Sequence, residues 1–257
     1  MPIQVCCACP RNAPCEFELV SYIYRMKGKR GVQLELPMRS WGGRRRGTGR
    51  KPNGARAGAS HLRRPELRAR HPVHVTMRLR AGLPSLRHKS LARLVFSAFH
   101  AAKLRLGARL VHFSVQSNHL HLLHLIVEVD NRRVLSRAMQ GLAIRLARRL
   151  NQRLTRRGRV FSDRFHARPL RTPLEVRRAL IYVLHNHRHH HSGPSHPSYF
   201  DCMSSAAYFD GFAGPAPRWS PHDFVPAEEP PVAAATTWLL RVGWRRLGLL
   251  GPNDMPA

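Results

Sequence analysis

The order of hydrophobic patterns over residues 71–190 restricts the fold more than any other feature of this chain. Residues 71–80 alternate apolar and polar side chains, as a half-buried strand does. Residues 86–106 then place apolar side chains at helical spacing. Two apolar segments follow, residues 108–115 and the histidine-containing stretch that ends at Asp130, and a short turn joins them. We expect these two segments to pair as antiparallel strands.

The second half of this region continues the pattern. Asn131 is suited to cap a long helix. The side chains expected to face inward on that helix are Leu135, Met139, Leu142, Leu146 and Leu150. After an extended segment, the sequence Thr-Pro-Leu-Glu at 172–175 is a capping signature for another helix, which runs to about Asn186 or Arg188. The order strand, helix, strand, strand, helix, strand, helix predicts an α+β domain with a ferredoxin-like antiparallel sheet, helices on one face and one additional helix.

The segments on either side of this region differ from it in composition. Residues 1–67 include a Gly- and Arg-rich stretch with no apolar period, which predicts a disordered basic arm. Residues 68–192 are the predicted folded domain. Residues 193–257 are rich in proline and serine, and we expect irregular structure there with one amphipathic helix near residues 233–247. The apolar stretch of that helix is short and contains arginines, so we do not expect it to span a membrane.

The chain is far more basic than solubility requires. Among 257 residues, 44 are Lys or Arg and 14 are Asp or Glu, which gives a formal net charge of +30. Such a charge attracts polyanions, and nucleic acid is the expected partner. A GC-rich coding bias is an alternative reason for Arg in place of Lys, but it does not account for the small number of acidic residues. The predicted phosphate contacts in the arm are Arg44, Arg45, Arg46, Arg50 and Lys51.

The stretch SNHLHLLHL at residues 117–125 contains three histidines. His119 and His121 are two apart, so on a strand they share a face and can bind one metal ion. His124 has the opposite parity and is expected to point away from that pair. Histidines two apart also arise by chance in a chain with 17 histidines, so a buried strand that happens to contain them is an alternative. A metal site requires a third ligand as well.

The last predicted helix offers such a ligand. Tyr182 and Asn186 are four residues apart and are therefore neighbours on one helical face. They lie on the flank of the stripe that is expected to pack this helix. The residues of that stripe are Val176, Leu180, Val183 and Leu184. A tyrosine in such a position is usually a packing residue, so the pair indicates function only in combination with the histidines.

These pieces together resemble a known family. The segments HPVHVT, SNHLHL, GRVFSDRFHA and YVLHN occur in the order and spacing of the bacterial REP-associated tyrosine transposases, which are single-tyrosine nucleases with a histidine–hydrophobic–histidine motif. The resemblance covers roughly residues 68–190 and, more loosely, the tail. It implies that His119 and His121 bind a metal ion with Asn186 as third ligand. Tyr182 matches the catalytic nucleophile.

The chemistry implied by the resemblance is metal-dependent strand transfer on DNA. Mg²⁺ or Mn²⁺ would act as a Lewis acid at the scissile phosphate, and the Tyr182 hydroxyl would attack to form a 5′-phosphotyrosine. The implied substrate is single-stranded DNA beside a palindromic hairpin, bound by a monomer or homodimer in the bacterial cytoplasm, at the nucleoid. Arg164 and Arg168 are candidates for phosphate contacts, although a solvated arginine is an equally good explanation for each.

The sequence departs from the family at residues 123–125. Family members run directly from SNHLHL into IVE, whereas Leu-His-Leu intervenes here. Three additional residues reverse strand parity, so Glu128 changes face unless a bulge corrects the register. We expect His119 and His121 to remain the ligands and His124 to lie outside the site. Two functions stay open: an active transposase-like nuclease, or a non-catalytic DNA-binding relative whose metal site is spoiled by the insertion Leu123–Leu125.

Overall fold

The computed structural model describes residues 66–105, 107–116, 122–190, 201–214, 229–251 and 254. All of them belong to one compact unit, Pro52–Ala257, and a second unit covers Met1–Lys51. The predicted basic arm up to residue 65 lies outside the described residues. Its predicted phosphate contacts are Arg44, Arg45, Arg46, Arg50 and Lys51. The predicted metal pair, His119 and His121, also lies outside the described residues.

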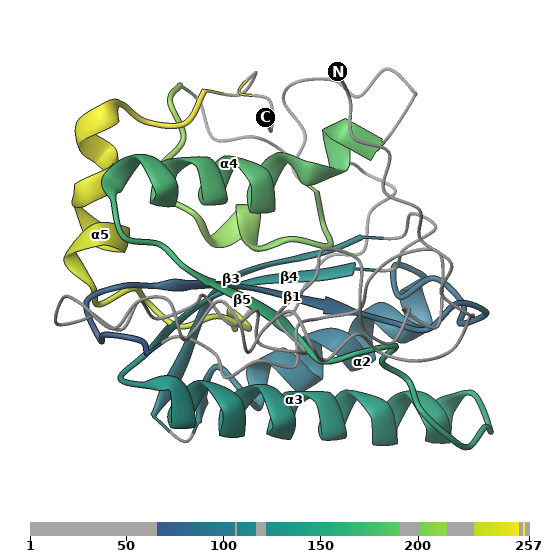
Figure 1. Cartoon of the computed structure of the whole chain (residues 1–257). Helices are drawn as coiled ribbons and strands as arrows, with labels where there is room; N and C mark the ends of the chain where they lie inside the picture. The colour runs from purple at the N-terminus through teal and green to yellow at the C-terminus, as the bar shows by residue number, and fades with distance from the viewer. Residues whose placement is uncertain are drawn as a thin grey trace, which may run out of the picture. The chain divides into compact units, whose positions relative to one another are not determined.

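Five antiparallel strands form one sheet in the order β2-β3-β4-β1-β5 (Figure 1). The strands are β1 (Val73–Arg78), β2 (Leu104–Arg105), β3 (Ala108–Val115), β4 (Leu122–Val129) and β5 (His166–Pro169). Apart from the short edge strand β2, the chain order is strand, helix, strand, strand, helix, strand. Without β2 the sheet has the order β3-β4-β1-β5, with β4 and β1 in the centre, which is the ferredoxin-like arrangement. The predicted fold class is therefore confirmed.

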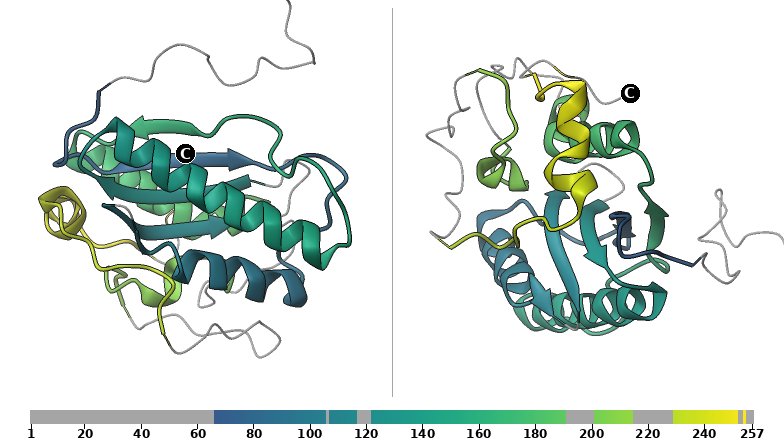
Figure 2. Two further views of the ribbon diagram at one scale, coloured as in Figure 1. Left: turned by 90° about the horizontal axis from the view of Figure 1, so that it is seen from below. Right: turned by 90° about the vertical axis from the view of Figure 1, so that its left-hand side faces the viewer.

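Helices cover both faces of this sheet (Figures 1 and 2). The helices α2 (Lys89–His100) and α3 (Arg132–Arg153) pack side by side on one face. The helix α4 (Pro173–His190) lies on the other face. This agrees with the prediction of helices on one face and one additional helix. We call the two sides of the sheet the α2–α3 face and the α4 face.

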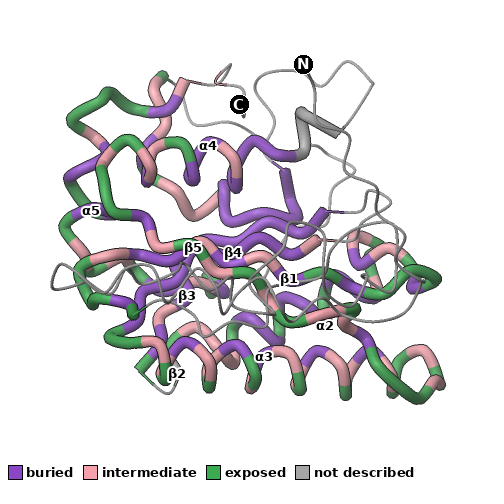
Figure 3. The backbone as a smooth tube through the Cα atoms, in the orientation of Figure 1, coloured by how far each residue is buried: buried purple, intermediate pink, exposed green. Residues whose placement is uncertain are grey.

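The strands of the sheet are largely buried (Figure 3), and the α2–α3 face buries apolar positions of β1 that the alternating pattern predicts, together with apolar positions of β4. From β1 and β4 these are Val73, Val75, Met77, Leu123, Leu125 and Val127. Phe113 of β3 is fully buried, and its ring centroid lies 5.3 Å from that of Phe96 and 4.7 Å from that of Phe99. The five side chains predicted to face inward from α3 are all buried: Leu135, Met139, Leu142, Leu146 and Leu150. This face is a continuous apolar core.

Side-chain caps fix where the two long helices begin. Asn131 Oδ1 accepts hydrogen bonds from the backbone N–H groups of Arg133 and Val134 at 2.9 and 3.0 Å, as predicted for the start of α3. At α4, the Glu175 N–H donates to Thr172 Oγ1 at 3.2 Å, and the Thr172 N–H donates to Glu175 Oε2 at 3.3 Å. These reciprocal bonds are the predicted capping box. A fixed start determines which residues of α4 face the sheet.

The C-terminal segment forms two short elements where we predicted one amphipathic helix near residues 233–247. The helix α5 (Trp238–Arg241) is followed by the 3₁₀ helix η3 (Gly243–Leu247). Trp244 of η3 is fully buried in an apolar cluster with α4, and its Nε1 donates to the Leu240 carbonyl at 2.9 Å. Another 3₁₀ helix, η2, spans Ser205–Tyr208. None of the described helices is long and apolar enough to cross a membrane.

Candidate active site

One histidine of β4 lies in the interior on the α4 face. His124 pairs with Thr76 of β1 and with Ser114 of β3, and its side chain is 2% exposed. Its neighbours Leu123 and Leu125 occupy core positions on the α2–α3 face, so strand alternation turns His124 toward α4. We expected His124 to point away from the site, but its ring lies against that of Tyr182, the predicted nucleophile. Leu123–Leu125 form a regular part of β4.

Tyr182 of α4 packs against this histidine. The ring centroids of Tyr182 and His124 are 5.0 Å apart, and the rings are nearly perpendicular at 86°. His74 of β1 lies 5.8 Å from Tyr182 and 5.6 Å from His124, again between ring centroids. Three rings from three elements therefore meet, and one of them belongs to the predicted nucleophile. We call His74, His124 and Tyr182 the ring cluster.

His74 is a residue of this site that the sequence reasoning missed. It lies between Val73 and Val75, which face the opposite side of the sheet. Burial, with a smaller contribution from the nearby His166 and Arg168, lowers the pKa of His74 to about 4. Its imidazole is therefore neutral at pH 7. The available signal was a histidine at a polar position of the HPVHVT strand, but only the packing of α4 buries that position.

Asn186 lies one helical turn after Tyr182, as its four-residue spacing predicts. We placed Asn186 on the flank of the packing stripe, but it is completely buried. Burial raises the pKa of the Tyr182 hydroxyl, and a hydrogen-bonding contact with the Asn186 side chain opposes this rise. Apart from this contact, neither Oδ1 nor Nδ2 of Asn186 has a hydrogen bond of good geometry within the described part of the chain. Because buried amides are normally fully bonded, this amide can take a further partner.

The ring cluster extends toward the surface along the edge strand β5. In the register between β5 and β1, His166 stands opposite Thr76, and Arg168 stands opposite His74. Cross-strand partners share a face of the sheet, so both side chains lie on the α4 face. Both are exposed, and Arg168 forms an ion pair with Glu175 at 3.1 Å. The predicted phosphate contact Arg168 thus lies beside His74 of the ring cluster.

Arg164, the other predicted phosphate contact in this part of the chain, is not brought into the ring cluster. Its side chain is exposed in the segment that precedes β5. Its backbone N–H donates to the carboxylate of Asp163 at 2.7 Å. Arg164 precedes the edge strand β5 in the sequence, and its exposed side chain can contact a ligand that approaches from solvent.

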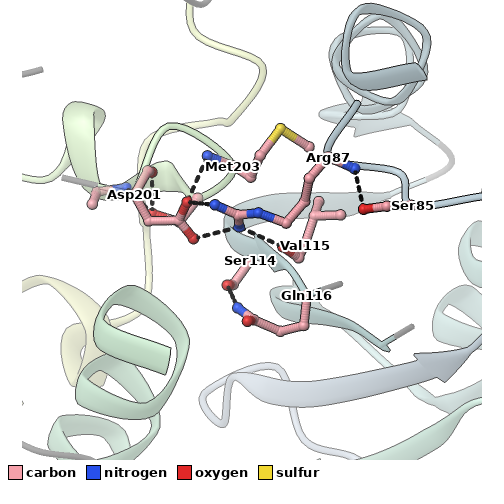
Figure 4. Close-up of polar contacts among 9 residues, drawn as sticks. Ser85, Arg87, Ser114, Val115, Gln116, Asp201 and Met203 are labelled. Carbon is pink, nitrogen blue, oxygen red and sulfur yellow. Dashed lines mark hydrogen bonds and ion pairs between the residues drawn. The ribbon is translucent and has the colours of Figure 1, made fainter. Parts of the chain in front are cut away.

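An ion pair fixes the end of β3, just before the histidine stretch (Figure 4). Arg87 donates to both carboxylate oxygens of Asp201 at 3.0 and 2.5 Å, and to the carbonyl of Val115 at 2.9 Å. Ser114, on the face of the ring cluster, accepts a hydrogen bond from Gln116 at 2.5 Å. The Asp201 side chain is buried, which strengthens a bidentate pair of this kind. These bonds hold the strand end from which the chain enters the histidine stretch.

Glu128, downstream of the histidines, has a structural role. It lies on the α4 face in β4 and is buried. Its carboxylate accepts hydrogen bonds from the backbone N–H and the hydroxyl of both Thr236 and Thr237, at 2.6 to 3.0 Å. These bonds attach the start of α5 to the sheet, where a negative charge is favourable. Glu128 is thus bonded to the C-terminal segment and is separate from the ring cluster.

The donors near Tyr182 are two imidazoles and one amide. Among the described residues, no group of three or more His, Cys, Asp or Glu side chains is arranged to hold a metal ion. However, His74 Nε2 and both amide atoms of Asn186 are buried without a partner in this part of the chain. Imidazole nitrogen and amide oxygen are both metal ligands. The donor set beside Tyr182 therefore fits the divalent cation that the sequence resemblance implies.

The similarity of this chain to known proteins is found among solved structures. No protein-family model matches the chain, and no curated protein matches it. Among solved structures, the REP-associated tyrosine transposase bound to a REP hairpin is similar, with a TM-score of 0.47 and 14% sequence identity. The similarity covers 65% of this chain and 99% of that one. We therefore base the functional proposal on the residues of this chain.

Proposed function

We propose that this protein is a metal-dependent endonuclease and strand transferase for single-stranded DNA, of the transposase type, with Tyr182 as nucleophile. The observation that supports this most is the contact between Tyr182 and the histidine strand, with 5.0 Å between the rings of Tyr182 and His124. Segments that are far apart in the sequence contribute to one site. HPVHVT provides His74, GRVFSDRFHA provides His166, and YVLHN provides Tyr182.

The reaction is a transesterification at phosphorus. The Tyr182 hydroxyl attacks the scissile phosphate and forms a phosphotyrosine bond to the 5′ phosphate of the 3′ fragment. The other fragment departs with a 3′-hydroxyl. Attack by a 3′-hydroxyl on the phosphotyrosine reverses the step, so rejoining needs no ATP. Because burial raises the pKa of Tyr182 above its ordinary value of 10, this hydroxyl is protonated at neutral pH. A proton must therefore be removed from the Tyr182 hydroxyl for the attack, and the leaving 3′-oxygen takes up a proton.

A divalent cation, Mg²⁺ or Mn²⁺, would supply Lewis-acid stabilisation of the phosphate oxygens. The resemblance implies His119, His121 and Asn186 as its ligands. Asn186 meets one requirement of that role, because its amide is buried beside Tyr182 and unbonded among the described residues. Arg168 adds a positive charge at the open side of the site, where it can contact the phosphate backbone.

The substrate that fits best is a single strand beside a palindromic hairpin. The net charge of +30 favours binding of the phosphate backbone. The proposed backbone contacts are Arg44, Arg45, Arg46, Arg50 and Lys51 of the arm, with Arg164 and Arg168 near β5. Unpaired bases would be recognised by stacking and at their edges.

A covalent adduct tests the proposed nucleophile. An oligonucleotide with a hairpin and a single-stranded flank is labelled at its 3′ end, because the 3′ fragment stays attached through its 5′ phosphate. We expect a labelled protein band on a denaturing gel in the presence of Mn²⁺. Tyr182→Phe should abolish this band and leave DNA binding intact. An undiminished adduct in Tyr182→Phe would exclude Tyr182 as nucleophile.

Tyr208→Phe is the matched control. Tyr208 of η2 is also partly buried, and burial also raises its pKa, but it lies outside the ring cluster. We expect the adduct to form in this variant as in the parent. Salt-sensitive DNA binding without any adduct in the parent, with every divalent cation tried, would instead support a non-catalytic DNA-binding relative.

A further inference from the structure

The ring cluster contains donors that the predicted metal pair leaves unused. His74 and His124 come from adjacent strands, and their ring centroids are 5.6 Å apart. Two imidazoles that bind one ion at about 2.1 Å have centroids roughly 4.5 to 5.5 Å apart. The two imidazoles are therefore close enough to share one ion. Asn186 adds an amide one helical turn from Tyr182, whose ring contacts both histidines.

Two of these three side chains have buried polar atoms that lack a hydrogen bond among the described residues. They are His74 Nε2 and both amide atoms of Asn186. An unbonded buried polar group is destabilising, and native proteins contain few of them. Such atoms occur here on two neighbouring elements beside one tyrosine. This indicates a ligand that bonds to both elements.

The third side chain is oriented by its strand neighbour. Thr76 Oγ1 lies 3.4 Å from His124 Nδ1. An oxygen at one imidazole nitrogen commonly fixes the ring of a metal-binding histidine, so that the other nitrogen is directed to the ion. Thr76 is the cross-strand partner of His124, so the sheet itself holds this geometry.

We propose that His74, His124 and Asn186 bind one divalent transition-metal ion beside the Tyr182 hydroxyl. Imidazole nitrogen favours Mn²⁺, Co²⁺ and later metals over Mg²⁺, and an amide oxygen is compatible with them. The role of this ion in DNA cleavage rests on the proposed function, but its binding does not.

This ligand set differs from the pair predicted from the sequence. On an uninterrupted strand, His119 and His121 have the opposite parity to His124, so a single register brings only one of the two sets to α4. The ring of His124 contacts that of Tyr182. Two residues before His124, on the same face, the chain has Leu122. The second imidazole of the proposed site therefore comes from β1 and not from β4.

Titration of the full-length protein with Mn²⁺ in the absence of DNA tests the proposal. The sequence at residues 187–191 is rich in histidine, which binds metal, so every protein in the series carries the same replacements there. These are His187→Gln, His189→Gln, His190→Gln and His191→Gln. Calorimetry gives the Mn²⁺ affinity, and the visible spectrum of bound Co²⁺ reports imidazole ligation. We expect His74→Leu and His124→Leu each to weaken Mn²⁺ binding at least tenfold.

His112→Gln is the control for these variants. It removes another buried histidine of the sheet, whose Nδ1 lies 3.2 Å from Ser205 Oγ, and should leave Mn²⁺ binding unchanged. The double variant His119→Ala with His121→Ala decides between the two ligand sets, because only the site proposed here predicts that Mn²⁺ binding survives in it. Thermal unfolding without metal establishes that each protein is folded. If a leucine variant is unfolded, the corresponding glutamine variant replaces it.

Several outcomes overturn the proposal. They are a parent that binds no Mn²⁺, binding that survives His74→Leu or His124→Leu, and binding that is lost in the double variant at His119 and His121. The last result returns the ligands to the predicted pair. None of these measurements involves DNA, so they separate a failure of this site from a failure of the proposed function, which the adduct at Tyr182 tests alone.

Discussion

The two faces of the sheet are formed by the same strands but bury different chemistry. The α2–α3 face packs aliphatic and phenyl side chains almost exclusively. The α4 face buries polar groups among its apolar ones: His112, Ser114, His124, Glu128 and Asn186. Apolar burial stabilises a fold in proportion to area, whereas a buried polar group costs free energy unless it is bonded. We infer that one face provides most of the stability and the other holds reactive groups.

Removing an aromatic side chain from the α2–α3 face should have the largest effect on stability. Phe113→Ala leaves a cavity beside Phe96 and Phe99, and we expect the free energy of unfolding to fall by about 3–5 kcal/mol. Urea denaturation measures this loss. Ile144→Ala is the control, because Ile144 of α3 is 44% exposed. Equal losses in the two variants would mean that this face does not provide the stability we assign to it.

Acid should lower the free energy of unfolding by favouring protonation of His112, which lies on the α4 face. Burial lowers the pKa of His112 to about 4, partly opposed by Asp210. Since the unfolded chain takes up this proton near pH 6.5, the stability from neutral His112 is complete above pH 6.5 and is lost as pH falls toward 4. Between pH 7.5 and 5, the parent should lose about 2 kcal/mol more than His112→Gln.

Urea denaturation of both proteins at the two pH values measures this difference. His74 also titrates with a lowered pKa, but it is present in both proteins and cancels in the comparison. The same loss in the parent and in His112→Gln would show that His112 is not responsible for acid sensitivity.

Replacing a functional polar group on the α4 face should raise stability, which is the opposite of the core substitution. Asn186→Leu removes a buried amide whose only polar contact among the described residues is with Tyr182 and which has no hydrogen bond of good geometry there, and we expect a gain of about 1–3 kcal/mol. The control is Asn151→Leu, because Asn151 Nδ2 donates to the Gly158 carbonyl at 2.9 Å and its loss should not stabilise. Urea denaturation measures both. A less stable Asn186→Leu would show that the amide has a partner in the free protein.

Much of the fold could be predicted from local patterns. The alternation in β1, the inward stripe of α3 and the caps at Asn131 and Thr172 depend on residues a few positions apart. The pairing of Tyr182 with Asn186 is of the same kind, because helical periodicity alone makes them neighbours. Near residues 233–247 the structure has α5 and η3 in place of the single predicted helix. This segment binds the Glu128 carboxylate at its start and packs against α4.

The sequence by itself determined the order of the elements, the apolar face of each and the four-residue spacing of Tyr182 and Asn186. Only the tertiary structure decided that His124 faces α4 and that His74 joins it. A strand has two equivalent faces, and which one becomes a site depends on the register between distant strands and on the helix that covers it. Thr76 and Tyr182, 48 and 58 residues from His124 in the sequence, complete the surroundings of that histidine.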